Sequence, residues 1–385
     1  MTEIHPFGDL FSIPSRNGVS VPKGDRSHGT QMINMGELFR FDRIGDSNMA
    51  RVPLSEHDLE KSLVQPGDLL FARRSLQLSG AGRCSIIAPA SEARTFESSL
   101  IRVRLDPERA SPDFYFYFFK SRVGRELMET IVEQAVVAGI RASDLKLLNV
   151  PVPPISEQRG TVSVLGSLDD KIALNRRAID LLEELGDALF HAAEDESVEL
   201  SAVAEIVMGS SPPGSSYNEE GLGVPFYQGV RDFSRRYPGY RVWTTDPVRT
   251  AEADDTLLSV RAPVGSLNRA RGACCIGRGL AAVRSNFGSA IYYALRGAGE
   301  VWAPFQSEGT VFGAINKTDL ARAHIPWTSN VTDLETTLSS LDGKIQSIDK
   351  ENESLNQLRD ALLPELLSGR IRVPEAKQAV AEVVA

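Results

Sequence analysis

The stretch LDDKIALNRRAIDLLEELGDAL at 168–189 has a counterpart later in the chain, LDGKIQSIDKENESLNQLRDAL at 341–362. Apolar residues recur along both at alternating spacings of three and four, the heptad pattern of coiled-coil helices. The a and d positions are Leu165, Leu168, Ile172, Asn175, Ile179, Leu182, Gly186 and Leu189 in the first stretch, and Leu338, Leu341, Ile345, Ile348, Asn352, Leu355, Arg359 and Leu362 in the second. The pattern predicts two long helices, each roughly 50 Å at 1.5 Å per residue, that pair as a coiled coil.

The match between the two stretches continues outside the helices. Residues 139–145 resemble residues 314–320, and Pro151 then falls on Pro326. Further upstream, Leu69-Leu70 followed by Arg73 matches Leu257-Leu258 followed by Arg261. Since these features recur in the same order, the chain is expected to be a tandem duplication of a globular domain followed by a helix. The expected boundaries are 1–153 and 197–327 for the domains, 154–196 and 328–370 for the helices, with Gly369 as a stop, and 371–385 for a C-terminal tail.

The direction of the helices follows from the order of the repeats. If each domain ends close to the start of its own helix, the second helix must run back along the first. An antiparallel pair with one domain at either end is therefore expected, with a pseudo-two-fold relation between the repeats. In that arrangement Asn175 and Asn352 share one core layer, where buried amides cost stability but fix the register. The alternative is two amphipathic helices packed on their own domains, and the narrow apolar stripe favours the coiled coil.

Both globular segments are expected to be mixed α/β, which makes the fold class α+β. Strands are predicted where β-branched and aromatic residues follow turn residues, at 69–72, 84–87, 100–103, 224–228 and 256–260. Ser111-Pro112 has the residue types that begin a helix. The aromatic run 114–119 follows it. These rings could stack on bases, but on a helix with both faces apolar they are more consistent with a hydrophobic core.

The net charge of −9 at first argues against a nucleic-acid partner. The excess of acid, however, lies in residues 154–200 and 328–385, and the two large segments are neutral or slightly basic. Arginines occur there in windows without acidic residues, as between Asp68 and Glu92 and between Asp255 and Glu300. Arginine makes bidentate contacts with guanine edges and phosphates, so double-stranded DNA is the expected partner, and a merely solvated surface is the alternative. The candidate DNA-binding residues are Arg73, Arg74, Arg83, Gln228, Arg231, Arg235, Arg236, Arg261, Asn268, Arg269, Arg271 and Arg278.

Other classes of function find little support in the sequence. It has no Walker-type phosphate loop, no HExxH and no GxSxG motif, so no catalytic residue is predicted. Cys84, Cys274 and Cys275 lack the spacing of a metal site and are expected to be buried thiols of a cytoplasmic protein, so no metal is predicted. No signal peptide or membrane-spanning segment is expected. Acid pairs such as Asp169-Asp170 and Glu183-Glu184 are interpreted as solvated.

Two motifs flank the predicted helices, LNVPVPPISEQ at 148–158 and LLPELLSGRI at 362–371. They resemble the entry into the first helix and the segment that closes the second in the specificity subunits of type I restriction-modification systems. Pro263-Val264-Gly265 after Arg261 also resembles an element of the second domain. The resemblance covers roughly residues 5–373. The second repeat departs from it at Pro326-Trp327-Thr328, where the first has its Pro-Pro-Ile-Ser-Glu-Gln stretch.

The resemblance implies a non-catalytic DNA specificity subunit with two target-recognition domains. Such a subunit reads an asymmetric target in two halves around an unread spacer. The implied partners are two methyltransferase subunits and the restriction (translocase) subunits. No cofactor is implied in this chain; S-adenosylmethionine, ATP and Mg²⁺ belong to the partners. If the helices set the spacer, inserting about four residues in each should change its length and leave both half-sites intact. A methylation-only complex, or a scaffold whose domains bind protein, remains an alternative.

Overall fold

The computed structural model describes residues 3–22, 27–133, 138–306 and 313–384. The chain divides into two compact units, Met1–Ala173 with Asn352–Ala385, and Leu174–Glu351. Each unit contains one β-rich module and one part of each long helix, α6 (Ile155–Ala193) and α11 (Val331–Ser368). The prediction of an α+β fold with two long helices is confirmed.

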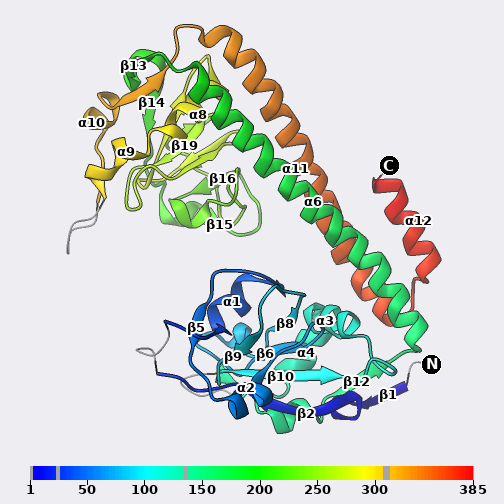
Figure 1. Cartoon of the computed structure of the whole chain (residues 1–385). Helices are drawn as coiled ribbons and strands as arrows, with labels where there is room; N and C mark the ends of the chain where they lie inside the picture. The colour runs from blue at the N-terminus through cyan, green and yellow to red at the C-terminus, as the bar shows by residue number, and fades with distance from the viewer. Residues whose placement is uncertain (1–2, 23–26, 134–137, 307–312, 385) are drawn as a thin grey trace. The chain divides into compact units, whose positions relative to one another are not determined.

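In unit 1 the first module is built on a five-stranded sheet with the order β2-β10-β6-β8-β4 (Figure 1). Its strands are β1 (Glu3–Pro6), β2 (Phe11–Asn17), β3 (Thr30–Ile33), β4 (Arg43–Ile44), β5 (Ala50–Val52), β6 (Leu69–Ala72), β7 (Arg74–Ser75), β8 (Cys84–Ile87), β9 (Arg94–Phe96), β10 (Leu100–Leu105), β11 (Ala138–Gly139) and β12 (Asn149–Val152). Its helices are α1 (Met35–Arg40), α2 (Glu56–Ser62), α3 (Pro112–Lys120), α4 (Arg122–Glu129) and α5 (Ala142–Leu145).

In unit 2 the second module has a four-stranded sheet with the order β14-β22-β19-β20 and a further sheet, β15-β17-β16-β21-β18. Its strands are β13 (Glu196–Glu199), β14 (Glu205–Met208), β15 (Tyr217–Asn218), β16 (Val224–Tyr227), β17 (Trp243–Thr244), β18 (Thr250–Ala251), β19 (Thr256–Ser259), β20 (Leu267–Arg269), β21 (Cys274–Ile276), β22 (Leu280–Arg284) and β23 (His324–Trp327). Its helices are α7 (Leu200–Val203), α8 (Gly288–Gly297), α9 (Gly299–Trp302) and α10 (Lys317–Ala321).

The two modules repeat one topology, which confirms the tandem repeat. The order β2-β10-β6-β8 in the first corresponds to β14-β22-β19-β20 in the second. Each module also closes on itself, because its first strand pairs antiparallel with the strand that precedes the long helix. Ile4 lies opposite Pro151 in the first pair, and Ser197 lies opposite Pro326 in the second. The equivalence of Pro151 and Pro326 therefore holds in three dimensions.

Within each unit the two long helices run antiparallel. In unit 1, Leu165 and Leu168 near the start of α6 share a core with Leu355 and Leu362 near the end of α11. In unit 2, Ile179 of α6 packs with residues of the first half of α11, Ile345 and Ile348. The a and d stripe read from the sequence is thus the surface that joins the helices.

The two asparagines of the stripe are both buried. Asn175, 6% exposed, donates a hydrogen bond from Nδ2 to Oε2 of Glu351 at 2.9 Å within unit 2. Asn352 belongs to unit 1 and is 7% exposed, and its amide oxygen accepts no hydrogen bond from the described residues. Because the two asparagines belong to different units, their sharing of one layer stays a prediction.

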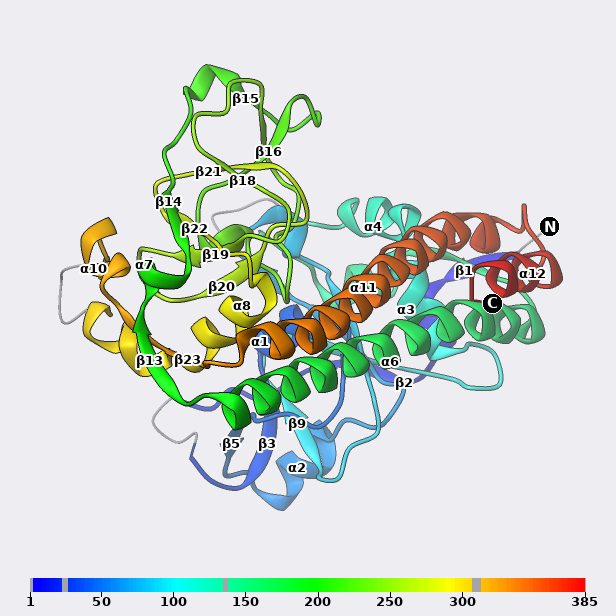
Figure 2. The same cartoon turned by 90° about the horizontal axis from the view of Figure 1, so that it is seen from above.

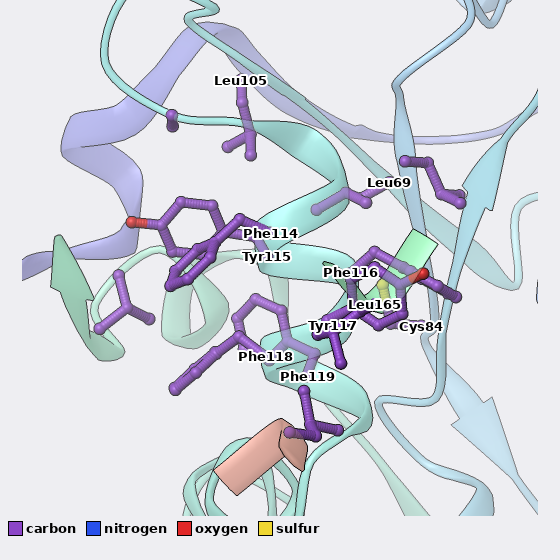
Figure 3. Close-up of a cluster of buried hydrophobic side chains, with 14 of the residues drawn as sticks. Leu69, Cys84, Leu105, Phe114, Tyr115, Phe116, Tyr117, Phe118, Phe119 and Leu165 are labelled. Atoms are coloured by element: carbon purple, nitrogen blue, oxygen red, sulfur yellow. The ribbon is translucent and has the colours of Figure 1, made fainter. Parts of the chain in front are cut away.

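The aromatic run forms the core of the first module, as expected. All six side chains of Phe114–Phe119 in α3 are at most 2% exposed, and they share a cluster with Leu165 of α6 (Figure 3). The ring of Phe119 lies 5.0 Å from that of Phe7 and 5.1 Å from that of Phe71, both edge to face. The interpretation of the run as core is therefore confirmed.

The end of the chain departs from the expected plain tail. Gly369 ends α11 with a φ of +72°, the left-handed conformation that favours glycine after a helix. A further helix, α12 (Val373–Val384), follows. Its residue Ala376 is fully buried, and Val373 lies so close to Gly160 of α6 that a Cβ there would come within 2.9 Å. Figure 2 shows α12 beside the first turns of α6, so the tail contributes to the core of unit 1.

Candidate nucleic-acid interface

The structure separates the candidate residues of the second module into two groups. The side chains of Gln228, Arg231, Arg261 and Arg278 are exposed, and we call these four residues reading surface 2. The other group faces the helices or the interior of the module. It comprises Arg235, Arg236, Asn268, Arg269 and Arg271.

Three of the four residues of reading surface 2 adjoin one hollow of about 280 Å³. Gln228 and Arg231 approach it from the loop after β16, and Arg261 from the segment after β19. Gly279 also lines the hollow, and Arg278 precedes it in the chain. Polar and cationic side chains from two segments, the loop after β16 and the segment after β19, thus line one hollow. Side chains that read base edges have to gather in this way.

Buried polar groups and close backbone contacts order these segments. Asp232, 5% exposed, accepts the backbone N–H of Gln228 at 2.7 Å and two hydrogen bonds from Arg241 at 2.9 and 2.6 Å. A Cβ at Gly279 would come within 2.4 Å of the carbonyl oxygen of Gln228, so only glycine allows the two backbones to meet. The backbone N–H of Val260 then donates to the carbonyl of Gly279 at 2.9 Å, which places Arg261 beside them.

In the first module Arg73, Arg74 and Arg83 form a looser group, which we call reading surface 1. Arg74 is exposed. Arg73 is half-buried and donates from Nη1 to the carbonyl of Ser98 at 3.4 Å. The side chain of Arg83 is 40% exposed and lies 3.8 Å from a carboxylate oxygen of Asp42. Its guanidinium carbon lies 5.3 Å from the ring centroid of Phe39.

The strand register changes one equivalence taken from the sequence. In the sequence comparison of the two repeats, Arg73 is aligned with Arg261. In the structure, Ile140 donates to the carbonyl of Arg73 at 3.0 Å, and Ile315 donates to that of Val260 at 3.0 Å. The next residue in each module is an arginine. Arg74 pairs with Gly139, and Arg261 forms an antiparallel β-bridge with Ala314. Arg74 is therefore the counterpart of Arg261, because β-pairing and not residue spacing fixes the position.

Three candidate residues are unavailable to DNA in this structure, which corrects their assignment. Arg236 is 2% exposed, Arg269 3% and Asn268 1%. Asn268 donates from Nδ2 to the carbonyls of Ser234 and Leu267 at 2.9 and 2.8 Å. Since their polar groups are used inside the unit, these residues stabilise the module and do not face a ligand.

The arginines on the helix side bind carboxylates of α6 and α11. Arg236 binds Glu183 and Asp342, and Arg269 also binds Asp342. The remaining ion pairs of this kind are Arg235 with Asp180, Arg271 with Asp349, and Arg296 with Asp187. Glu183, interpreted from the sequence as solvated, is 7% exposed, and Asp169 accepts hydrogen bonds from Tyr117 and Arg359. The solvated interpretation was therefore wrong for Glu183, whereas the side chain of Asp169 is 25% exposed.

Arg236 remains charged despite its burial. Burial lowers the pKa of its guanidinium, but four neighbours together outweigh that effect, so the pKa lies above its ordinary value. In order of effect they are Tyr292, Asp342, Tyr293 and Glu183. None of the acids that bind these arginines was predicted from the sequence to do so, and Glu183 was interpreted as solvated. The only signal for the ion pairs was the acidic character of the two helical segments.

The described residues offer little for other chemistry. No group of three or more His, Cys, Asp or Glu side chains among them could hold a metal ion. Cys84, Cys274 and Cys275 are free and buried, as predicted. Burial raises the pKa of Cys274 to about 12, with smaller contributions from Cys275 and Asp255. Of the helices in the described part of the chain, none is both long and apolar enough to cross a membrane.

Comparison with known proteins agrees with this architecture. Residues 7–184 match the family model of the type I restriction modification DNA specificity domain. The matched part of this chain comprises most of the first module and most of α6. It is 28% identical over 402 residues to a Methanocaldococcus jannaschii protein named as the type I restriction enzyme MjaX specificity subunit, covering 96% of this chain and 94% of that relative.

Two further specificity subunits are similar to this chain. The type I restriction enzyme EcoKI specificity subunit of Escherichia coli is 28% identical over 145 residues, which are 37% of this chain and 31% of that protein. The crystal structure of the S subunit of a type I restriction-modification system from M. genitalium superposes with a TM-score of 0.56 at 18% identity, covering 94% of this chain and 95% of that one. The likeness to the M. genitalium subunit supports the fold of two β-rich modules and two long helices.

Proposed function

We propose that this chain is a DNA specificity subunit of a type I restriction-modification system. It reads an asymmetric DNA target in two halves, one with each module, and the helix pair sets the length of the spacer between them. The observation that carries the proposal is the repeat. Two modules with one sheet topology each present exposed arginines at equivalent positions, Arg74 after β6 and Arg261 after β19. Two readers built alike and differing in surface residues suit a target whose halves differ in sequence.

Reading surface 2 is proposed to contact base edges of one half-site. Arg261, Arg231 and Arg278 are suited to guanine and to phosphate, and Gln228 to adenine. Reading surface 1 would contact the other half-site with Arg73, Arg74 and Arg83. Acids of α6 and α11 that bind arginines of the second module have their charge neutralised there, which lowers the repulsion of nearby phosphates.

The chain would act in a complex. We propose two methyltransferase subunits as partners, which supply S-adenosylmethionine, and restriction subunits, which supply ATP and Mg²⁺ chemistry. The specificity subunit would contribute no reacting group. Its part is to select the DNA sequence, and to hold the two half-sites at one separation and rotation along the duplex.

The test is to map methylated motifs in a host that expresses this chain with its methyltransferase subunit, and to repeat it with Arg261→Ala. The wild type should give two half-sites around a spacer of fixed length. Arg261→Ala should relax one position of one half-site, with roughly 1–3 kcal/mol of discrimination lost, and leave the spacer unchanged. The control is Arg284→Ala, since Arg284 binds Asp255 within the module and lies outside reading surface 2.

Two results would contradict the proposal. A contiguous motif in the wild type would exclude the bipartite model, and changes in both half-sites of Arg261→Ala would exclude one module per half-site. If the modules instead bound protein, the affinity of the chain for duplex DNA would depend little on salt, whereas phosphate contacts make it fall steeply as salt rises.

A further inference from the structure

Arg236 occupies an unusual position for a fully charged side chain. It is 2% exposed, and its Nη1 donates to Oε1 of Glu183 in α6 at 3.1 Å. Its Nη2 donates to Oδ1 of Asp342 in α11, and its guanidinium lies 4.0 Å from the ring centroid of Tyr292 in α8. One side chain of the second module thus binds both long helices at once and packs on the helix that covers its own sheet.

Asp342 is the centre of this arrangement. Besides Arg236 it accepts a hydrogen bond from Nη1 of Arg269 and lies 3.3 Å from the hydroxyl of Tyr293. Asp342 is 7% exposed, so its charge is compensated inside the protein and not by water. Around this centre, the more exposed Arg296 makes a bidentate contact with Asp187 of α6 at 2.8 and 2.7 Å.

The equivalent aspartate in the first repeat is held differently. Asp169 takes the place of Asp342 in the Leu-Asp-x-Lys-Ile pattern. It accepts a hydrogen bond from the hydroxyl of Tyr117 in α3 at 2.6 Å and from Nη1 of Arg359 in α11 at 2.9 Å. The tyrosine contact is therefore common to both repeats, whereas the buried arginine of the module belongs to the second.

An ionic contact of this kind restricts orientation more than an apolar one. A guanidinium that donates to two carboxylates has its N–H directions fixed by its planar fork, and a rotation that breaks either contact leaves buried charge unpaired, at a large cost. Apolar surfaces lose little when they slide, because the hydrophobic effect is not directional. Hence the second module should have one strongly preferred orientation on the helices of unit 2.

Orientation matters on the scale of one base-pair step. A module of about 130 residues has a radius of gyration of roughly 14 Å. A tilt of roughly 14° moves a point that lies about 14 Å from the pivot by about 3.4 Å, the rise of one base pair. A module free to tilt by that amount would accept targets whose spacers differ by one base pair.

We propose that Arg236, held between Glu183 and Asp342, is a positioning residue that fixes the orientation of the second module on its helices and so restricts the complex to one spacer length. This inference rests on the proposed function. It extends that function because it assigns the choice of spacer to the module–helix contact as well as to the length of the helices.

The experiment compares the full chain with Arg236→Met and Arg236→Lys, each expressed with the methyltransferase subunit and mapped for methylated motifs. In the wild type, sites with the native spacer should be preferred at least tenfold over sites one base pair longer or shorter. Arg236→Met should reduce that preference to about threefold or less and keep both half-site sequences. Arg236→Lys, which keeps the charge but replaces the planar fork of donors by a single ammonium nitrogen, should lie between. Arg284→Met is the matched control, an arginine–aspartate pair inside the module, and should keep the wild-type preference.

If Arg236→Met keeps the wild-type preference for the native spacer, with unchanged half-sites, the inference is overturned. If Arg236→Met yields no folded chain, Arg236→Lys and Arg296→Gln decide by the same measure, because the latter breaks the more exposed contact with Asp187. If these two variants both keep the wild-type preference for the native spacer, the inference is likewise overturned. Failure of the proposed function is distinguishable, since the wild type itself would then give no bipartite motif.

Discussion

The two modules share a topology but are attached to their helices by different chemistry. In unit 1, α3 presents six buried aromatic side chains, which form one apolar cluster with residues of α6 and α11. In unit 2, α8 also joins an apolar cluster, but arginines of the module reach five carboxylates on the same two helices. The comparison teaches that one repeated fold can be fixed by apolar packing in one copy and by directional ion pairs in the other.

The largest expected difference between the two units should appear when the equivalent aspartates are removed in turn. Asp342→Ala leaves Arg236 and Arg269 with buried charge that has lost its main partner, which should cost about 3–5 kcal/mol of folding free energy. Asp169→Ala removes contacts to Tyr117 and to Arg359, whose side chain is 23% exposed, and should cost about 1 kcal/mol. Urea unfolding of both variants measures the difference. Equal losses of folding free energy would show that the ion pairs of Asp342 stabilise unit 2 no more than the contacts of Asp169 stabilise unit 1.

A smaller effect should come from the glycine that makes room for this contact. A Cβ at Gly186 of α6 would meet ring atoms of Tyr293 at 2.3–2.5 Å, although Gly186→Ala also favours the helix by about 1 kcal/mol. Since overpacking costs about 1–3 kcal/mol, a net loss of up to about 2 kcal/mol is expected in thermal unfolding. The control is Gly166→Ala on the same helix, where a Cβ meets nothing within 4 Å and a gain of up to about 1 kcal/mol is expected. A gain in both variants would mean that Tyr293 moves aside without cost.

The sequence was sufficient for features whose signal is local. Leu69–Ala72 and Cys84–Ile87 are strands with the predicted bounds, and the aromatic run of α3 is core. The two helices followed from the heptad pattern, because a stripe of apolar residues has to be buried whatever the partner. Gly369 was correctly taken as the end of the second helix.

The sequence failed where a side chain's partner is distant in the chain. Arg236 looked like any arginine in a basic window, yet it binds Asp342, which lies 106 residues away. Charge counts cannot tell an arginine that faces solvent from one that faces a buried carboxylate. The same limit applied to Glu183, whose acidic neighbours suggested a solvated face. Of the candidate residues in the second module, those that stay exposed are the ones on loops after strands, such as Arg261 and Gln228.

The most direct test of the central claim, that the helix pair sets the spacer, is to lengthen both helices by one heptad. Seven residues would be inserted between Ala173 and Leu174 and seven between Glu351 and Asn352, which keeps the a and d stripe in phase. Each helix grows by roughly 10 Å, so methylation mapping should show a spacer longer by about three base pairs and both half-sites unchanged. An unchanged spacer, or altered half-sites with the old spacer, would contradict the account.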